Sequence, residues 1–432
     1  MKIIRTGDTV FEETFRRIRQ RGKLFDTVLW AVVRGIVDDV AARGDRALFH
    51  YTEKFDGVVL NAASVEVSLQ EQEDAIAQVG RDDLEILGLA ARRIESFHRQ
   101  QLREDWSISD DEGIELGQRV TPLERIGIYA PGGLAAYPST VLMAAIPAKI
   151  AGVDEIILVS PNREGGVKPL IAAAARLGGV KRIFKIGGAQ AVAALAFGTG
   201  SVPRVDKIVG PGNAYVAAAK KMVYGQVAID MIAGPSEVVV IADGKADAAS
   251  VAADLLAQAE HDAMASAVLV TPDETLALQV VSEVERQLKL LPKKTIAVRS
   301  LEDFGALFIT KDISEAVAIA NRFAPEHLEL MVENPQEILK RIRNAGAVFL
   351  GYSTPEAIGD YIAGPNHILP TGGTARFSSP LGVYDFVKRT SVLSFSPDSL
   401  RKYGRQAERF ARMEGLDGHG ESIAVRLARN KP

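Results

Sequence analysis

The most restrictive feature of this sequence is a regular alternation of short apolar segments and helical segments that begins near residue 120. Apolar runs recur at 125–129, 155–159, 182–186 and 205–209, and helices are predicted from Pro138, at 168–177, from Ala189 and at 213–223. Pro138 suits the first turn of a helix because proline has no N–H to leave unpaired. Short apolar strands that alternate with helices predict a parallel sheet covered on both faces.

A second series of the same kind follows. Strands are predicted at 237–241, 267–270, 295–298, 328–332 and 347–350, with a helix at about 247–263. A chain of 432 residues is too long for one compact core, and roughly two to three domains are expected. We therefore predict an α/β protein with two Rossmann-like, doubly wound lobes.

The two ends of the chain differ from this central part. Residues 1–120 are predicted to be mainly helical, with one periodic run that starts at Leu24-Phe25-Asp26 and stops at Gly44. A second helical pattern at 82–103 is rich in charge, as expected for a solvated helix face. Residues 380–432 combine weak strand signals with a charged helix near 398–413, which indicates a tail that packs on something else.

Composition excludes several classes of protein. The chain has no cysteine, so a disulfide scaffold, a thiolate nucleophile and a cysteine-ligated metal are all impossible. Its formal net charge of −4 gives no basic excess of the kind that nucleic-acid binding requires. The N-terminus lacks the apolar core of a signal peptide, and the most apolar stretches are interrupted by Pro, Lys, Asp or Gly. We expect a cytoplasmic protein with no membrane partner.

Three glycine-rich turns mark possible dinucleotide contacts. They are Pro131-Gly132-Gly133, Gly187-Gly188-Ala189-Gln190 and Gly210-Pro211-Gly212-Asn213, and each joins a predicted strand to a predicted helix. Ligands bind at that edge of a parallel sheet, where helix N-termini offer free N–H groups to phosphate. The chain has no GxGxxG fingerprint, and each turn alone is equally consistent with a tight connection that uses glycine for positive φ. Three such turns in one lobe favour a shared ligand site.

The histidines suggest a metal. Of the six, His50 and His98 lie in helical, charged surroundings typical of surface or packing residues. Gln258 and His261 are three residues apart at the end of a helix, so they share a face and suit two ligands of one ion, although a structural role is the commoner use of such a pair. Asp360 and His419 could complete a nitrogen and oxygen set, which fits Zn²⁺, with Mn²⁺ or Co²⁺ also possible.

Proton transfer is suggested by Glu326-His327, which stands at a turn just before an apolar strand. Neutral histidine accepts protons near pH 7, and a carboxylate can orient it or activate water. A lone Glu-His pair is usually a surface turn, so its position at a sheet edge is what favours a functional role.

Taken together, these motifs resemble the histidinol dehydrogenase family, and the resemblance runs from about residue 20 to residue 425. The segments that carry it are Gly187–Ala191, Val209–Asn213, Ala233–Glu237, Gln258–Asp262, Pro325–His327, Gly359–Tyr361 and Glu414–Leu416 with His419. The resemblance implies a four-electron oxidation of L-histidinol to L-histidine through the aldehyde, with two NAD⁺ consumed and one Zn²⁺ per subunit.

The resemblance also implies roles for individual residues. The zinc ligands would be Gln258, His261, Asp360 and His419, and the NAD contacts would be Tyr129, Gln190 and Asn213. His327 would act as general base in the alcohol step, and Glu326 would activate water against the aldehyde. The residues implied to contact substrate are Ser236, Gln258, His261, Glu326, His327, Asp360, His367, Glu414 and His419.

The family's homodimer implies a division of the chain. Residues 1–128 and 236–380 would form a substrate and metal lobe, residues 129–235 an incomplete Rossmann-like NAD lobe, and residues 381–432 a dimerisation tail exchanged between subunits. Glu414 and His419 would then act in trans. Two alternatives remain: a related metal-dependent NAD alcohol dehydrogenase acting on another small polar alcohol, such as a sulfonated diol, and a binding protein that keeps only the fold.

Overall fold

The structure is a computed structural model that describes residues 1–21, 27–132, 137–161 and 166–429. It divides into two compact units, Met1–Gln101 with Leu123–Phe386, and Leu102–Pro122 with Val387–Pro432. Within the described part of the chain, every helix is too short or too polar to cross a membrane. The start of the predicted run at Leu24-Phe25-Asp26 and the glycine at position 133 lie outside the described residues.

The first unit contains a five-stranded parallel sheet in the order β6-β5-β4-β7-β8. Its strands are β4 (Arg125–Tyr129), β5 (Glu155–Val159), β6 (Arg182–Phe184), β7 (Lys207–Val209) and β8 (Ala228–Ile229). The helices between them are α6 (Pro138–Ala151), α7 (Pro169–Gly178), α8 (Gly188–Phe197) and α9 (Ala214–Val223). Side chains alternate between two cores, because Ile126 and Ile128 face one side while Tyr129, Ile157 and Val159 face the other. The predicted doubly wound sheet is confirmed.

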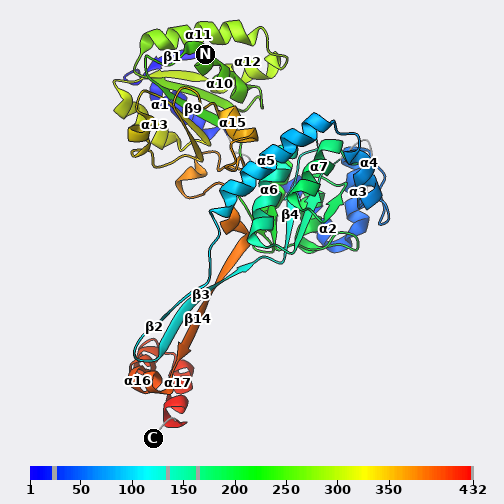
Figure 1. The fold of residues 1–432 in the computed structure, drawn as a ribbon, viewed down its shortest axis with the longest axis vertical. Coiled ribbons are helices and arrows are strands. Elements are labelled where there is room, and N and C mark those ends of the chain that lie inside the picture. The colour runs from blue at the N-terminus through cyan, green and yellow to red at the C-terminus, as the bar shows by residue number, and fades with distance from the viewer. Residues whose placement is uncertain (22–26, 133–136, 162–165, 430–432) are drawn as a thin grey trace. The chain divides into compact units, whose positions relative to one another are not determined.

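The first unit also contains a six-stranded parallel sheet in the order β1-β11-β10-β9-β12-β13 (Figure 1). Its strands are β1 (Lys2–Arg5), β9 (Glu237–Ala242), β10 (Ser266–Thr271), β11 (Ala306–Ile309), β12 (His327–Met331) and β13 (Ala347–Leu350). The helices that accompany it are α1 (Phe11–Gln20), α10 (Ala248–Ala259), α11 (Glu274–Leu288), α12 (Lys294–Phe304), α13 (Ile313–Phe323), α14 (Pro335–Leu339) and α15 (Glu356–Tyr361). Helices α10, α11 and α12 share a core with one face, and α1 and α13 with the other.

The strand predicted at 295–298 is wrong, because this segment lies in helix α12. Ala297 and Leu301 are buried one helical turn apart while Ile296 is exposed, which is a helical pattern that a four-residue apolar run cannot reveal. The strand of this region is β11, which begins eleven residues later. Strand β1, in a stretch predicted to be mainly helical, pairs with β11 at the sheet edge.

Between α1 and the five-stranded sheet, the described chain forms four more helices: α2 (Thr27–Arg43), α3 (Asp45–Asp56), α4 (Leu69–Ile76) and α5 (Arg81–Arg99). Helices α2 and α3 share a core with one face of that sheet and α5 with the other. Of the earlier N-terminal elements, β1 pairs with β11 of the six-stranded sheet, and α1 packs in a core with one face of that sheet. The pattern at 82–103 likewise has a buried face, which includes Ile94 and His98, rather than a wholly solvated one.

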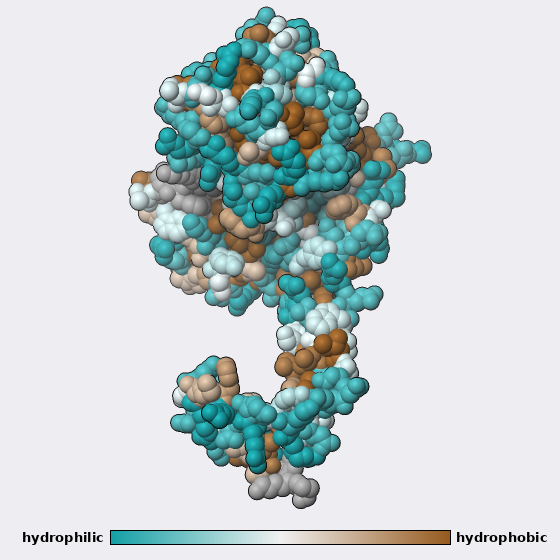
Figure 2. Space-filling model, turned by 90° about the vertical axis from the view of Figure 1, so that its left-hand side faces the viewer, coloured by the Kyte–Doolittle hydropathy of each residue, from teal (hydrophilic) through white to brown (hydrophobic). Residues whose placement is uncertain are grey.

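The second unit is an antiparallel ribbon that carries two helices. Strand β3 (Ile114–Pro122) pairs with β2 (Trp106–Ser109) and with β14 (Val387–Phe395), and α16 (Pro397–Met413) and α17 (Asp417–Arg429) follow. Strands β2 and β3 depart from the mainly helical structure predicted for residues 1–120, whereas the charged helix predicted near 398–413 is confirmed as α16. Large apolar side chains of the ribbon, including Trp106, Ile108 and Leu393, are exposed, and Figure 2 shows hydrophobic side chains gathered on it.

Candidate active site

The candidate active site lies where the strand order of the six-stranded sheet reverses. From β9 the chain winds through β10 and β11 on one side and then through β12 and β13 on the other, so β9 and β12 are neighbours. His327 opens β12 beside Val238 of β9, with Ser236 just before β9. Helix α10 runs back to the same amino-terminal edge and ends at Ala259, which places Gln258 and His261 there. Tertiary structure therefore gathers Ser236, Gln258, His261, Glu326 and His327 at one edge.

His327 is buried and held in one orientation. Its Nδ1 atom lies 3.2 Å from the carbonyl oxygen of Glu237, which can only accept, so Nδ1 carries the proton. Nε2 therefore bears the lone pair, and among the described residues it has no hydrogen-bond partner. Desolvation lowers the pKa of His327 to about 3, with repulsion from His261 and His367 adding to the shift. The imidazole is thus neutral and has a free acceptor nitrogen.

Glu326 is also buried, and its Oε2 atom accepts a 3.0 Å hydrogen bond from the backbone N–H of Glu237. Burial, together with the negative charges of Glu237 and Asp360, raises the pKa of Glu326 well above its usual value. The Glu237 carboxylate is held by Arg21, with 2.8 Å between Arg21 Nη2 and Glu237 Oε2 in a pair that is almost fully buried. Glu237 therefore positions both residues of the predicted proton-transfer pair.

Gln258 and His261 face each other as their spacing predicts, with Gln258 Nε2 3.3 Å from His261 Nδ1. Gln258 is fully buried, and its Oε1 atom has no hydrogen-bond partner among the described residues. The His261 side chain keeps access to solvent, yet partial desolvation lowers its pKa, and so does the positive charge of Lys293. An orphaned buried amide oxygen beside an imidazole is suited to a cation.

Asp360 and His367 complete the cluster. Asp360 Oδ1 lies 4.0 Å from His327 Nε2 and 4.0 Å from His367 Nδ1, and burial raises the pKa of Asp360 to about 6. His367 Nδ1 is 2.9 Å from the carbonyl oxygen of Asp360, and Nε2 is 3.4 Å from the Thr140 hydroxyl. Desolvation lowers the pKa of His367 to about 4. His367 is therefore a second neutral imidazole in the same cluster.

These residues offer nitrogen and oxygen donors of the types that Zn²⁺ accepts. The described residues contain no complete group of three or more His, Asp or Glu side chains arranged as a metal site. The predicted set would not form such a group within the first unit, because Gln258 is an amide and His419 belongs to the second unit. The donors at this edge, Gln258, His261 and Asp360, fit an incomplete ligand set.

The predicted NAD contacts lie at the five-stranded sheet. Tyr129 ends β4, Gln190 is in the first turn of α8, and Asn213 caps α9 by accepting hydrogen bonds from the N–H groups of Tyr215 and Val216. The hydroxyl of Tyr129 accepts a 3.1 Å bond from the N–H of Gly188. Gln190 is buried, and both polar atoms of its amide are without partners in the described chain. An unsatisfied buried amide of this kind calls for a polar ligand.

Glycine is required at two of these turns. Gly188 has a φ of +65°, and Gly210 has a φ of +107° in a position where a Cβ atom would lie 2.2 Å from the carbonyl oxygen of Tyr129. The Gly188 turn follows β6 and the Gly210 turn follows β7, and the neighbours β4 and β7 mark the point where this sheet's strand order reverses. A dinucleotide is expected at such a crevice.

Glu414 and His419 lie in the second unit, where Glu414 follows α16 and His419 lies in the first turn of α17. Both side chains are exposed. Of the histidines set aside by the sequence, His50 is exposed on α3 and His98 is buried with Nδ1 2.8 Å from the Ile94 carbonyl oxygen, as expected for surface and packing residues.

Sequence reasoning missed four buried acids beside this cluster: Glu237, Asp254, Glu329 and Glu356. Their signal was present, since Glu329 interrupts an apolar strand and Asp254 stands in a helix that is apolar nearly all round. A carboxyl group at a position that the pattern assigns to the core needs a partner or a proton.

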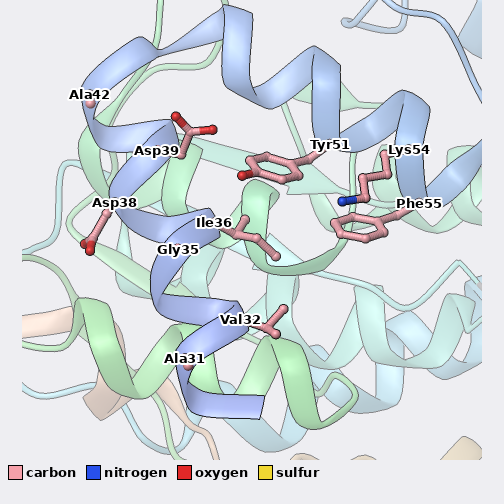
Figure 3. Close-up of a pocket in the computed structure, with 10 residues that line it drawn as sticks. All are labelled: Ala31, Val32, Gly35, Ile36, Asp38, Asp39, Ala42, Tyr51, Lys54 and Phe55. Atoms are coloured by element: carbon pink, nitrogen blue, oxygen red, sulfur yellow. The ribbon is translucent and has the colours of Figure 1, made fainter. Parts of the chain in front are cut away.

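A surface groove lies elsewhere, between α2 and α3 (Figure 3). Asp39 in this groove pairs with Arg43, and Lys54 lies over the Phe55 ring. The residues drawn around it include none of those predicted for the site.

Comparison with known proteins gives one consistent result. The histidinol dehydrogenase family model matches residues 19–427. Histidinol dehydrogenases of Syntrophotalea carbinolica and Geobacter sulfurreducens are each 54% identical to the chain, covering 99% of it and 99% and 100% of their own lengths. The solved histidinol dehydrogenase of Elizabethkingia anophelis superposes with a TM-score of 0.93 at 39% identity, covering 99% of this chain and 98% of its own. The chain belongs to the histidinol dehydrogenase family of enzymes.

Proposed function

We propose that this enzyme oxidises L-histidinol to L-histidine through L-histidinaldehyde, using Zn²⁺ and two NAD⁺ in a four-electron reaction of histidine biosynthesis. The observation that carries the proposal is the convergence of a neutral, oriented imidazole at His327 with Glu326, Gln258, His261 and Asp360. Each of these groups has a distinct task in the oxidation of a small polar alcohol.

His327 is the proposed general base of the alcohol step. The substrate hydroxyl proton goes to Nε2, which bears the lone pair, while Nδ1–H stays on the Glu237 carbonyl oxygen. Correct tautomer and orientation are needed for such a transfer. The carboxyl group of Asp360, 4.0 Å from Nε2, favours the imidazolium that results, because a negative charge nearby stabilises a positive one.

Glu326 is the proposed activator of water in the aldehyde step. At rest its raised pKa keeps it protonated, so it must lose that proton before it can accept one from water. A positive charge beside it, such as the substrate ammonium group, favours its ionised form. A carboxylate is required for this task because a chain without cysteine cannot form a thiohemiacetal.

Gln258, His261 and Asp360 would hold the zinc together with His419, and when bound the ion would orient the substrate imidazole and amine. Tyr129, Gln190 and Asn213 would hold NAD, which accepts the hydride. Ser236, His367 and Glu414 would contact the substrate. The Oε1 atom of Gln258 and both polar atoms of the Gln190 amide support these assignments, since all are buried and have no hydrogen-bond partner in the described chain.

We propose further that the enzyme is a homodimer in which Glu414 and His419 reach the partner's site. Support comes from the exposed apolar side chains of the second unit, since exposed hydrophobic surface of this kind marks an interaction site. An exchanged tail would bury these side chains and complete the ligand set at once.

The proposal is tested by incubating the purified chain with L-histidinol and excess NAD⁺ and counting NADH formed per histidinol. Two NADH per histidinol and histidine as product are expected, with loss of turnover after chelation and recovery with Zn²⁺. One NADH per histidinol would leave the aldehyde step unsupported. Faster turnover of another small alcohol would move the substrate assignment to that compound.

A further inference from the structure

Three buried carboxyl groups lie together behind the proposed site. Asp254, Glu329 and Glu356 are 8%, 1% and 3% exposed. They come from α10, β12 and α15, three elements that are far apart in sequence. None of the three has a task in the proposed mechanism.

One hydrogen bond and one close approach connect these groups with each other and with His327. The Oε1 atom of Glu329 accepts a 2.7 Å hydrogen bond from the backbone N–H of Glu356, which opens α15. Glu356 Oε1 in turn lies 3.4 Å from Nδ1 of His327. The interaction between Asp254 and Glu329 is a longer one, since Glu329 Oε2 has no described partner at normal hydrogen-bond distance.

Each of the three carboxyl groups lies on the same helix or strand as one residue of the proposed site. Asp254 is one helical turn before Gln258 on α10, and Glu356 is one turn before Asp360 on α15. Glu329 is two residues after His327 on β12, so the two side chains share a face of the strand. The carboxyl groups therefore connect the three elements that carry Gln258, His327 and Asp360.

Burial favours the neutral, protonated forms of these carboxyl groups. Burial raises the pKa of Glu329 and of Glu356 well above the usual value, and neighbouring carboxyl groups add to both shifts. Burial raises the pKa of Asp254 to about 6, and the interaction with Glu329 opposes the rise, as expected when Glu329 supplies the proton. Hydrogen-bonded neutral carboxyl groups can fix geometry without placing net charge in the core.

We propose that Asp254, Glu329 and Glu356 form a positioning triad. The triad holds α10, β12 and α15 in fixed positions relative to one another and fixes the orientation of His327. This inference rests on the proposed function, because it assigns the triad to the same reaction. Groups that orient catalytic side chains or metal ligands typically change activity or metal affinity about 10–100-fold when removed.

The test compares Glu329→Met with Glu329→Gln. Glutamine keeps an acceptor for the Glu356 N–H and presents an N–H donor toward Asp254, whereas methionine offers neither. We expect Glu329→Met to lower kcat for histidinol about 10–100-fold with the KM for NAD⁺ unchanged, and Glu329→Gln to restore most of that kcat. Thr310→Val, a buried polar change on the same sheet beyond the site, is the matched control and should leave kcat unchanged.

Two readouts do not depend on turnover. In protein labelled with ¹⁵N-histidine, the His327 imidazole should be in the Nδ1–H form in the wild type and in Glu329→Gln, and a mixture of tautomers in Glu329→Met. Zinc affinity should fall about 10–100-fold in Glu329→Met, because Gln258 and Asp360 lose their support. If the wild type fails to oxidise histidinol, the proposed function is wrong. The His327 tautomer and the zinc affinity would still show whether the triad positions the site residues.

The triad is overturned if Glu329→Met keeps wild-type kcat, zinc affinity and tautomer, or if Glu329→Gln is as impaired as Glu329→Met. If Glu329→Met does not fold, Glu356→Leu against Glu356→Gln gives the same comparison. If both Glu356 variants lose the Nδ1–H form of His327, or if both keep it, the proposal is refuted.

Discussion

The Nδ1 atom of His327 lies 3.2 Å from the carbonyl oxygen of Glu237, on the strand next to its own. The N–H of the same Glu237 donates to Glu326, so one backbone residue holds both members of the proposed proton-transfer pair. The parallel register of β9 and β12 fixes this arrangement. Fixed orientation of this kind is what a general base requires.

Because Glu326 and His327 have different proposed tasks, replacing each of them should slow a different half-reaction. Glu326→Gln should slow oxidation of histidinaldehyde about 100-fold or more while it affects the alcohol step much less, because only the aldehyde step needs an activated water. His327→Asn is the comparator and should slow the alcohol step. Single-turnover NADH formation from each substrate measures this, and an equal fall of both half-reactions in Glu326→Gln would show that its role is not specific to water.

Removing a proposed metal ligand should empty the site. His261→Asn is expected to lower zinc affinity more than the roughly 10–100-fold typical of groups that only support a ligand. Zinc content after dialysis, measured by elemental analysis, is the readout. His50→Asn, on the exposed face of α3, is the control and should keep its zinc. Full retention of zinc by His261→Asn would remove this residue from the ligand set.

Sites shared between subunits predict complementation. His261→Asn and His419→Asn should each be inactive alone, because both remove a proposed ligand. When the two are unfolded together and refolded, half of the dimers are mixed and one of their two sites is intact, so roughly a quarter of wild-type activity should return. If both residues act within one subunit, mixing restores nothing.

The buried pair between Arg21 and Glu237 should be important for stability. Arg21→Met leaves a buried carboxylate without its partner, which typically costs about 3–5 kcal/mol. Arg5→Met, which removes the exposed Arg5–Glu274 pair, should change stability by less than about 1 kcal/mol. Urea unfolding of both variants measures the difference, and similar losses would argue that Arg21 acts by packing alone.

Replacing Asp254 with asparagine is predicted to give a gain in stability that depends on pH. Its folded-state pKa of about 6 lies above the ordinary value of 3.8, so its contribution is most favourable at low pH and declines as pH rises through this range. Asp254→Asn removes the decline, so its stability relative to wild type should improve between pH 4 and pH 7, by at most about 3 kcal/mol. A difference that does not vary with pH would show that Asp254 titrates normally.

Several elements could be predicted from local pattern alone. The strands at 125–129, 155–159 and 347–350 match the structure residue for residue, because continuous apolar runs between turn signals have few other solutions. The run at 295–298 failed because four apolar residues fit a helix as well as a strand, and the true neighbour of β10 was decided by packing. Strands β2 and β3 of the antiparallel ribbon were missed, and the region of β14 gave only weak strand signals, because exposed strands carry no core pattern.

The sequence by itself determined the chemistry available to this protein: no thiol, a small set of histidines, and motifs whose order and spacing match one family. It also determined the local contact between Gln258 and His261, which a helical turn dictates. Only tertiary structure decided that Glu326 and His327 both contact the backbone of Glu237. It also decided that Asp254, Glu329 and Glu356 lie close together next to this pair. Contacts between residues about 90 positions apart depend on which strands pair and in what register, and that depends on burial summed over the whole core.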